Sequence, residues 1–204
     1  MNTNLVGADL TGANLTGTTL TGTNFSDTHS VTEVVTAANL TSAILTSANL
    51  VSQDLTSVDF EKAVLSGADL TGADLENAIL TGANLTTDGT NAVKLTGAIL
   101  TGAKLSKADL TGADLGKNPA GAATNLVGAD LTGAILINAD LEDAILVNDV
   151  VGSKGANLEK ANLTNATLTG TVFSVTHSVS GVVTAANLTS AIPVSYTHLT
   201  LPTN

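Results

Sequence analysis

The sequence predicts an all-β solenoid, a rod wound from one repeated five-residue unit. Two observations support this fold class. First, every fifth position from 5 to 115 gives 23 sites, and 20 of them are Leu or Phe, the exceptions being Ser30, Val35 and Thr90. Second, a small residue, usually Ala, stands two positions before most of these large residues, as Ala8 does. Such strict spacing predicts that each unit occupies an equivalent place in a repeating structure.

A period of five excludes the regular elements. On an α-helix, five steps of about 100° rotate by about 140°, so the leucines would be scattered around the axis. In an extended strand, an odd period sends successive leucines to opposite faces. A chain that turns a corner once per unit instead sends every central residue toward one common axis. The central Leu and the preceding Ala are therefore expected inside, and the Asn or Asp between them outside.

Each unit ends with Thr or Ser and often Gly, which are also expected to face water. Gly eases a tight corner because it tolerates backbone angles that other residues avoid. The unit ADLTG appears at residues 8–12, 68–72, 108–112 and 129–133. The expected structural core consists of central leucines, represented by Leu10, Leu15, Leu40, Leu50, Leu70, Leu75, Leu80, Leu110, Leu131 and Leu163.

With this unit the chain resembles the pentapeptide-repeat family, whose repeat is written A(D/N)Lxx. The resemblance covers nearly all of residues 4–192. It implies a right-handed quadrilateral β-helix with four units, or about 20 residues, in each coil. Ten coils spaced about 4.8 Å apart would form a rod of roughly 48 Å. The period alone does not determine that the coil has four sides.

The repeat domain is expected to span residues 1–192, with irregular breaks near 26–34, 86–94, 116–125 and 147–155. These breaks predict surface bulges or short loops between intact coils. Residues 193–204 are expected to be a foreign or disordered tail.

A partial duplication supports that boundary. Residues 19–44 recur at 167–192, with 22 of 26 positions identical, and the second copy then stops abruptly. The segment that follows, PVSYTHLTLPTN, contains no repeat and resembles a translated sequencing adapter.

Composition excludes several classes of function. The chain has no Cys, which excludes disulfides, thiolate metal sites and thiol nucleophiles. Seven Lys against 18 acidic residues give a net charge of −11, which opposes binding to nucleic acid or to anionic membranes. No apolar run approaches the roughly 20 residues that span a bilayer, and the start lacks a leader pattern, so we expect no membrane span and favour the cytoplasm.

Histidine is the residue type best suited to acid–base chemistry at neutral pH. His29 and His177 occupy equivalent places in the two copies of the duplication. A metal site or catalytic triad would use Asp27 and Glu33 as partners, but both acids are absent from the second copy. We therefore expect structural histidines, no catalytic, cofactor-binding or metal site, and no enzyme activity.

The leading functional hypothesis is a structural or protein-interaction scaffold, with an unknown protein partner or self-association. Counting sides in fours from Leu5 places Ile79 beside Ile99 and Ile44 beside Val64 on neighbouring coils. These positions usually hold Asn or Asp. Exposed apolar pairs are therefore predicted as partner contacts.

The alternative hypothesis is an acidic DNA mimic, because some pentapeptide-repeat proteins present an acidic rod to DNA gyrase. The same count places Asp54, Asp74 and Asp114 on one side. Duplex DNA, however, carries about one charge per 1.7 Å, or roughly 28 over a 48 Å rod. The whole chain has only 18 acidic residues, diluted by seven Lys, so the scaffold is preferred.

Overall fold

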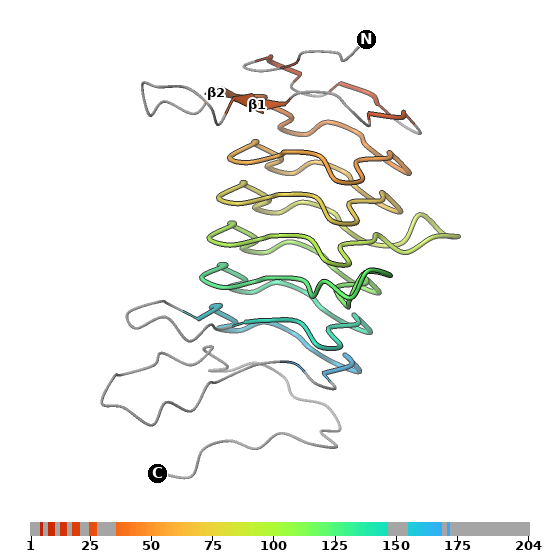
Figure 1. Cartoon of the computed structure of the whole chain (residues 1–204), viewed down its shortest axis with the longest axis vertical. Coiled ribbons are helices and arrows are strands. Elements are labelled where there is room, and N and C mark those ends of the chain that lie inside the picture. The colour runs from red at the N-terminus through yellow and green to blue at the C-terminus, as the bar shows by residue number, and fades with distance from the viewer. Residues whose placement is uncertain are drawn as a thin grey trace.

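The protein is a right-handed quadrilateral β-helix whose coils stack along one long axis (Figure 1). The computed structural model describes residues 5, 8–10, 13–15, 18–20, 25–27, 36–146, 155–168 and 171. The described coils follow one another from the red N-terminal coil to the blue coil near residue 168 (Figure 1). Isolated parallel bridges join the second residue of each A(D/N)Lxx unit, which we call its heading residue, to the heading residue of the equivalent unit in the next coil. This residue is the outward Asn or Asp of the repeat.

These bridges form four ladders, one for each side of the coil, which we name A to D in chain order. Side A is headed by Asp9, Asn39, Asp59, Ile79, Lys104, Asp130 and Asn157. Side B is headed by Asn14, Ile44, Val64, Asn84, Asp109, Ile135 and Asn162. Side C is headed by Thr19, Asn49, Asp69, Lys94, Asp114, Asp140 and Thr167. Side D is headed by Asp54, Asp74, Ile99, Asn125 and Ile145.

Each corner without inserted residues is a four-residue turn that begins at the central Leu or Phe. In the turn after Leu40, the N–H of Ala43 donates to the Leu40 carbonyl at 2.9 Å. The third residue of the turn has a positive φ, 57° at Ser42 and 66° at Gly67, as a type II turn requires. Gly therefore recurs at this position because it adopts such angles without strain, and Ser, Asn, Asp and Lys fill it elsewhere.

The central Leu or Phe and the preceding Ala point inward and form one continuous core. Of the leucines expected there, eight are 0–1% exposed: Leu40, Leu50, Leu70, Leu75, Leu80, Leu110, Leu131 and Leu163. Leu10 and Leu15 are half-buried because they lie in the first described coil and pack against the core from one side. Asp69, Thr71 and Asp74, expected to be exposed, are half-buried because equivalent residues lie above and below them.

Extra residues leave the coil only at corners. Bridged residues are 20 apart between Asn39 and Asp59, but 25 apart between Asp69 and Lys94 and 26 apart between Ile99 and Asn125. These longer spacings correspond to loops at the B–C corner, residues 86–92, and at the C–D corner, residues 116–123. The first is the yellow-green loop that projects from the stack (Figure 1).

Two further insertions occupy the D–A corner. The spacing is 30 residues between Asp9 and Asn39 and 27 between Asp130 and Asn157. The first insertion contains the only named strands of the described chain, β1 (Ser26–Asp27) and β2 (Thr36–Ala37). They pair antiparallel, with Ser26 opposite Ala37.

The insertions correct two expectations. Ile44 and Val64 are bridged neighbours, but Ile79 is bridged to Lys104, and Ile99 to Asp74 and Asn125, so the expected stacking of Ile79 on Ile99 is wrong. The count in fours failed because residues 86–92 leave the coil.

For the same reason Asp114 lies on side C, one side away from Asp54 and Asp74. Within the described residues, the ladder of side A has seven members. The described rod therefore rises about 29 Å over six steps of about 4.8 Å.

Candidate functional site

The outward Asn and Asp have a structural task that the sequence analysis missed. The side chain of Asn39 accepts a hydrogen bond at 2.9 Å from the N–H of Thr41, two residues on. Asp59 accepts the same bond from Glu61 at 2.8 Å. This Asx turn satisfies an N–H that the ladder between coils leaves free. The pattern recurs at Asn49, Asp54, Asp69, Asp74, Asn84, Asp109, Asp114, Asn125, Asp130, Asp140, Asn157 and Asn162.

Isoleucine at this heading position cannot form that bond. Ile44, Ile99 and Ile135 head their units and are 37%, 39% and 36% exposed, the large hydrophobic residues that the described chain exposes most. Ile79 and Val64 also head units and are half-buried. These apolar side chains therefore replace a stabilising polar contact and leave apolar surface in water.

Acidic residues gather on the two adjoining sides C and D. Side C presents Asp69, Asp114, Asp140, Glu142 and Asp143. Side D presents Asp54, Asp74 and Glu76. Two lysines reduce this charge: Lys94 pairs with Asp69 at 3.1 Å and Lys117 with Asp143 at 2.9 Å. All four of these side chains remain about a third exposed or more, so the pairs are screened by water.

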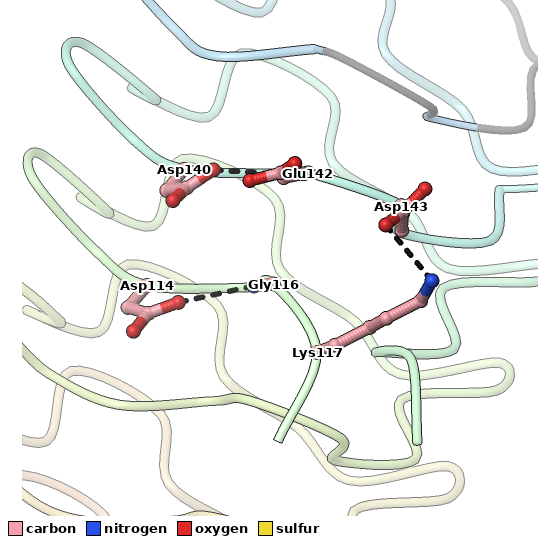
Figure 2. A pocket seen from close by; sticks show the side chains of 6 residues that line it. All are labelled: Asp114, Gly116, Lys117, Asp140, Glu142 and Asp143. Atoms are coloured by element: carbon pink, nitrogen blue, oxygen red, sulfur yellow. Dashed lines mark hydrogen bonds and ion pairs between the residues drawn. The ribbon is translucent and has the colours of Figure 1, made fainter. Parts of the chain in front are cut away.

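The lower part of side C forms an open hollow of about 340 Å³. Figure 2 shows its lining residues, Asp114, Gly116, Lys117, Asp140, Glu142 and Asp143. The N–H of Gly116 donates to Asp114, and the N–H of Glu142 donates to Asp140 at 3.0 Å, so both carboxylates mainly cap the backbone. In the described part of the chain, no group of three or more His, Asp or Glu is arranged to hold a metal ion.

The pKa values of the Asp69 and Asp130 carboxyl groups are lower than the ordinary value for aspartate. Partial burial raises the pKa of Asp69, but hydrogen bonds from Thr71 and the charge of Lys94 outweigh burial and lower it overall. The pKa of Asp130 is lowered in the same way, against burial, by Ser106 and Thr132. Carboxylates held below their ordinary pKa stay charged at neutral pH and are poor general acids.

Hydrogen bonds of Asp88 fix the 86–92 loop to itself and to a neighbouring coil. Its carboxylate accepts bonds from the N–H of Asn91 at 2.7 Å, the hydroxyl of Ser47 at 2.5 Å and the N–H of Thr90 at 2.8 Å, and these lower the pKa of Asp88 strongly. A side chain at Gly67 would collide with Asp88. Asp88 therefore fixes the loop to Ser47 and beside Gly67 on neighbouring coils, at the B–C corner. His29 and His177, considered as site candidates above, lie outside the described residues.

The sequence matches the family model for pentapeptide repeats in eight copies, over residues 2–29, 36–72, 54–86, 91–117, 122–148 and 154–174. The chain belongs to the pentapeptide-repeat family. A search of curated proteins found no match. No described segment of this pentapeptide-repeat chain forms a helix with the length and apolar character needed to cross a membrane.

Solved pentapeptide-repeat structures resemble it along most of its length. HetL, involved in heterocyst differentiation regulation in the cyanobacterium Nostoc, is 31% identical over 84% of this chain and 83% of HetL, with a TM-score of 0.36. Trypsin-treated QnrB1, a plasmid-mediated fluoroquinolone resistance protein, is 21% identical over 84% of this chain and 89% of its own, with a TM-score of 0.54. Rfr23 from the cyanobacterium Cyanothece is 29% identical over 83% and 90%, with a TM-score of 0.30. The likeness to QnrB1 supports the fold.

Proposed function

We propose that this chain is a non-enzymatic scaffold that binds other proteins through its outward faces. The observation behind the proposal is the exposure of Ile44, Ile99 and Ile135 at positions where the repeat otherwise places a backbone-capping Asn or Asp. Asn there would form one more hydrogen bond, worth about 0.5–1.5 kcal/mol. Each isoleucine keeps more than a third of its surface in water, so folding gains only part of what its burial could provide.

Contact with a partner would bury the remaining surface. Contiguous exposed apolar surface marks protein-binding sites, and two of the three isoleucines have an apolar neighbour: Ile44 is bridged to Val64, and Ile137 follows Ile135 in the same unit. Side chains on a β-helix are also held rigidly by the ladders above and below, which reduces the entropy lost on binding. A rod with several such positions suits a scaffold better than a catalyst, because the described carboxylates mainly cap turns.

The test compares capture of proteins from a bacterial extract by the immobilised chain and by the triple variant Ile44→Asn, Ile99→Asn and Ile135→Asn. A matched control replaces three outward threonines, Thr41, Thr81 and Thr101, with Ser and keeps every isoleucine. A protein retained by the wild-type chain is then purified and its affinity measured by calorimetry. We expect the isoleucine variant to weaken binding at least tenfold and the control to leave it unchanged. Equal binding by both variants, or no retained protein, contradicts the scaffold.

A DNA mimic is the second candidate, and the gathering of acids on adjoining sides C and D favours it. These sides present eight acidic residues and two paired lysines over a height of about 29 Å. Duplex DNA of that length carries about 17 charges. The acidic surface thus reaches less than half the charge density of DNA, and the scaffold remains the preferred function.

A gyrase supercoiling assay separates the two functions. The scaffold predicts no inhibition by the wild-type chain. A mimic predicts inhibition that falls with added salt and is lost when Asp54, Asp74 and Asp114 become Asn. The matched control combines Asp9→Asn, Asp59→Asn and Asp130→Asn on side A, because it also removes three charges from heading positions. Inhibition lost only in the first variant would replace the scaffold with the mimic.

A further inference from the structure

Side D divides along the rod into an acidic half and an uncharged half. Asp54 and Asp74 are the first two heading residues of its ladder, and Glu76 follows Asp74 outward. Both aspartates cap the backbone, and all three side chains remain at least partly exposed. The next three heading residues are uncharged: Ile99, Asn125 and Ile145. Within the described residues, the units of this ladder contain no lysine.

The uncharged half of side D is apolar. Ile99 is 39% exposed, and Ile145 lies half-buried two steps further along the same ladder. The C–D corner loop borders this half, because the Asn118 side chain occupies the space beside Gly97, two residues before Ile99. Three residues of this loop with little polar surface are exposed: Pro119, Ala120 and Ala122. The apolar surface thus extends from side D onto the loop.

Charge determines where a cationic partner can lie. On side C, the lysines that border side D pair with acids of their own side, Lys94 with Asp69 and Lys117 with Asp143. On side A, lysines accompany the acids: Lys62, Lys104, Lys107 and Lys160. The acids of side D lie together on adjacent coils without a lysine in their units. A complementary partner therefore carries cations over the first two coils of this ladder and aliphatic side chains over the next three.

We propose that side D binds an amphipathic α-helix of another protein, which lies along the rod axis. Its cationic residues face Asp54, Asp74 and Glu76, and its aliphatic residues face Ile99 and Ile145. The inference rests on the proposed function and names the class of partner that Ile99 contacts.

The spacing of the coils suits a helix. One helical turn rises about 5.4 Å and one coil about 4.8 Å, so residues alternately three and four positions apart on one helix face meet successive coils. About 15 helical residues cover the five coils of the ladder. A helix is about 10 Å wide, as is a side of three residues. An extended strand fits less well, because side chains on one face of a strand recur about every 6.7 Å.

Electrostatics orient the helix. Its N-terminus carries the positive end of the helix dipole, so this end is expected over Asp54 and Asp74. Four steps of about 4.8 Å and a width of about 10 Å give roughly 200 Å² of flat surface, well below the roughly 800 Å² per partner of a stable interface. We therefore expect weak binding, with a dissociation constant in the high micromolar range.

Fluorescence anisotropy of two labelled synthetic peptides with the purified chain tests the inference. Both peptides have about 18 residues on an Ala and Gln background, which favours helix. The first presents Lys, Lys, Leu, Leu and Leu, in this order, at contact positions spaced alternately three and four residues apart. The control peptide keeps the Leu residues and moves both Lys to the opposite helix face. We expect the first peptide to bind about fivefold more tightly than the control, and this advantage to fall as salt is added.

Variants of the chain locate the apolar contact. Ile99→Asn should weaken binding of the first peptide about fivefold, because it removes an exposed apolar side chain at the centre of the contact. Ile135→Asn is the matched control, because Ile135 has nearly the same exposure but lies on side B, and it should leave the affinity unchanged.

A second pair of variants locates the charged contact. Asp74→Asn with Glu76→Gln should remove the advantage of the first peptide over the control peptide. Asp59→Asn with Glu61→Gln should preserve it, because these acids occupy the same positions of the same coil on side A. No binding at millimolar peptide, equal binding of the two peptides, or equal effects of the variants on side D and their controls would overturn the inference. Only purified chain and synthetic peptides are used, so such a result leaves the extract experiment of the proposed function intact.

Discussion

Replacing Leu75 with Asp tests the fold at its most informative position. Leu75 is 0% exposed and lies on side D, where the bridges at Asp54, Asp74 and Ile99 place it between Leu55 and Leu100 of the neighbouring coils. The change removes about 1.5–3 kcal/mol of apolar burial. It also brings a carboxyl group without a partner to a dry axis, at a cost of several kcal/mol more. The total approaches the 5–15 kcal/mol that stabilises a typical domain.

Acid should partly rescue this variant, and the sign follows from burial. Burial raises the pKa of the new carboxyl above its unfolded value of about 3.9, so the folded state binds the proton more tightly. The free energy of unfolding of Leu75→Asp should therefore be highest below about pH 4 and fall as the pH rises. Leu75→Asn has a similar size and no titrating group, so it should lack this dependence.

Urea unfolding followed by circular dichroism between pH 4 and pH 7 measures both effects. The difference between Leu75→Asp and Leu75→Asn removes the background titration of the native acids. Leu75→Ala, expected to lose about 2–5 kcal/mol, provides a value if the Asp variant does not fold at neutral pH. Unchanged stability in any of the three variants would show that Leu75 does not face a packed axis and would refute the reasoning.

Three further predictions follow from the outward residues and the tail. Asn84→Ala removes the acceptor of bonds from the N–H and hydroxyl of Thr86 and the hydroxyl of Ser66, and should cost about 1–2 kcal/mol in urea unfolding, whereas Asn84→Asp keeps the acceptor and should cost little. Asp69 has a lowered pKa, so its contribution, at most about 1 kcal/mol, should be present above about pH 4, vanish as the pH falls, and be absent from the titration of Asp69→Asn. Deleting residues 193–204, which lie outside the described residues and lack the repeat, should leave the melting temperature within a few degrees; a larger loss would identify them as a cap.

The inward half of the structure could be predicted from sequence because burial imposes a strict rule. The axis position holds Leu or Phe, and the position two residues earlier holds Ala or another small side chain such as Val58 or Thr124, so the period holds from Leu40 to Leu115 and resumes, shifted, at Leu126 and Leu158. Each coil packs around the axis in the same way, so the same residue types recur at the same positions of the repeat. The family resemblance supplied the number of sides, which the period leaves open.

The assignment of residues to sides could not be obtained by counting, and the B–C loop shows why. Leu85 and Leu95 are both buried and ten residues apart, so the loop between them leaves the register of the leucines unchanged. Counting in fives then passes through residues that have left the coil. Thr90, which occupies a leucine position beside the turn-forming pair Asp88 and Gly89, does mark the predicted break near 86–94, but the count in fours included these residues as if they still belonged to the coil.

The capping role of the outward Asn and Asp could have been found from sequence, because these side chains commonly accept a bond from the N–H two residues on. Once the cap is recognised, an isoleucine in the heading position becomes a departure from a structural rule as well as an exposed apolar residue. Ile99 is the clearest example, since Asn125 heads the next unit on the same side and forms the cap.

A solenoid can bear such departures because its stability is nearly additive over neighbouring coils. Four units contribute the inward residues of each coil, and the loops at three corners leave these residues in place. A cap that is missing at Ile44 or Ile135 weakens one turn by about 1 kcal/mol and does not disturb the packed axis. The outward sides are then free to differ from one another. Acids concentrate on sides C and D, lysines offset the acids of side A, and the exposed isoleucines lie on sides B and D. Substitutions of the outward isoleucines should therefore change binding to a partner while they leave the packed axis intact.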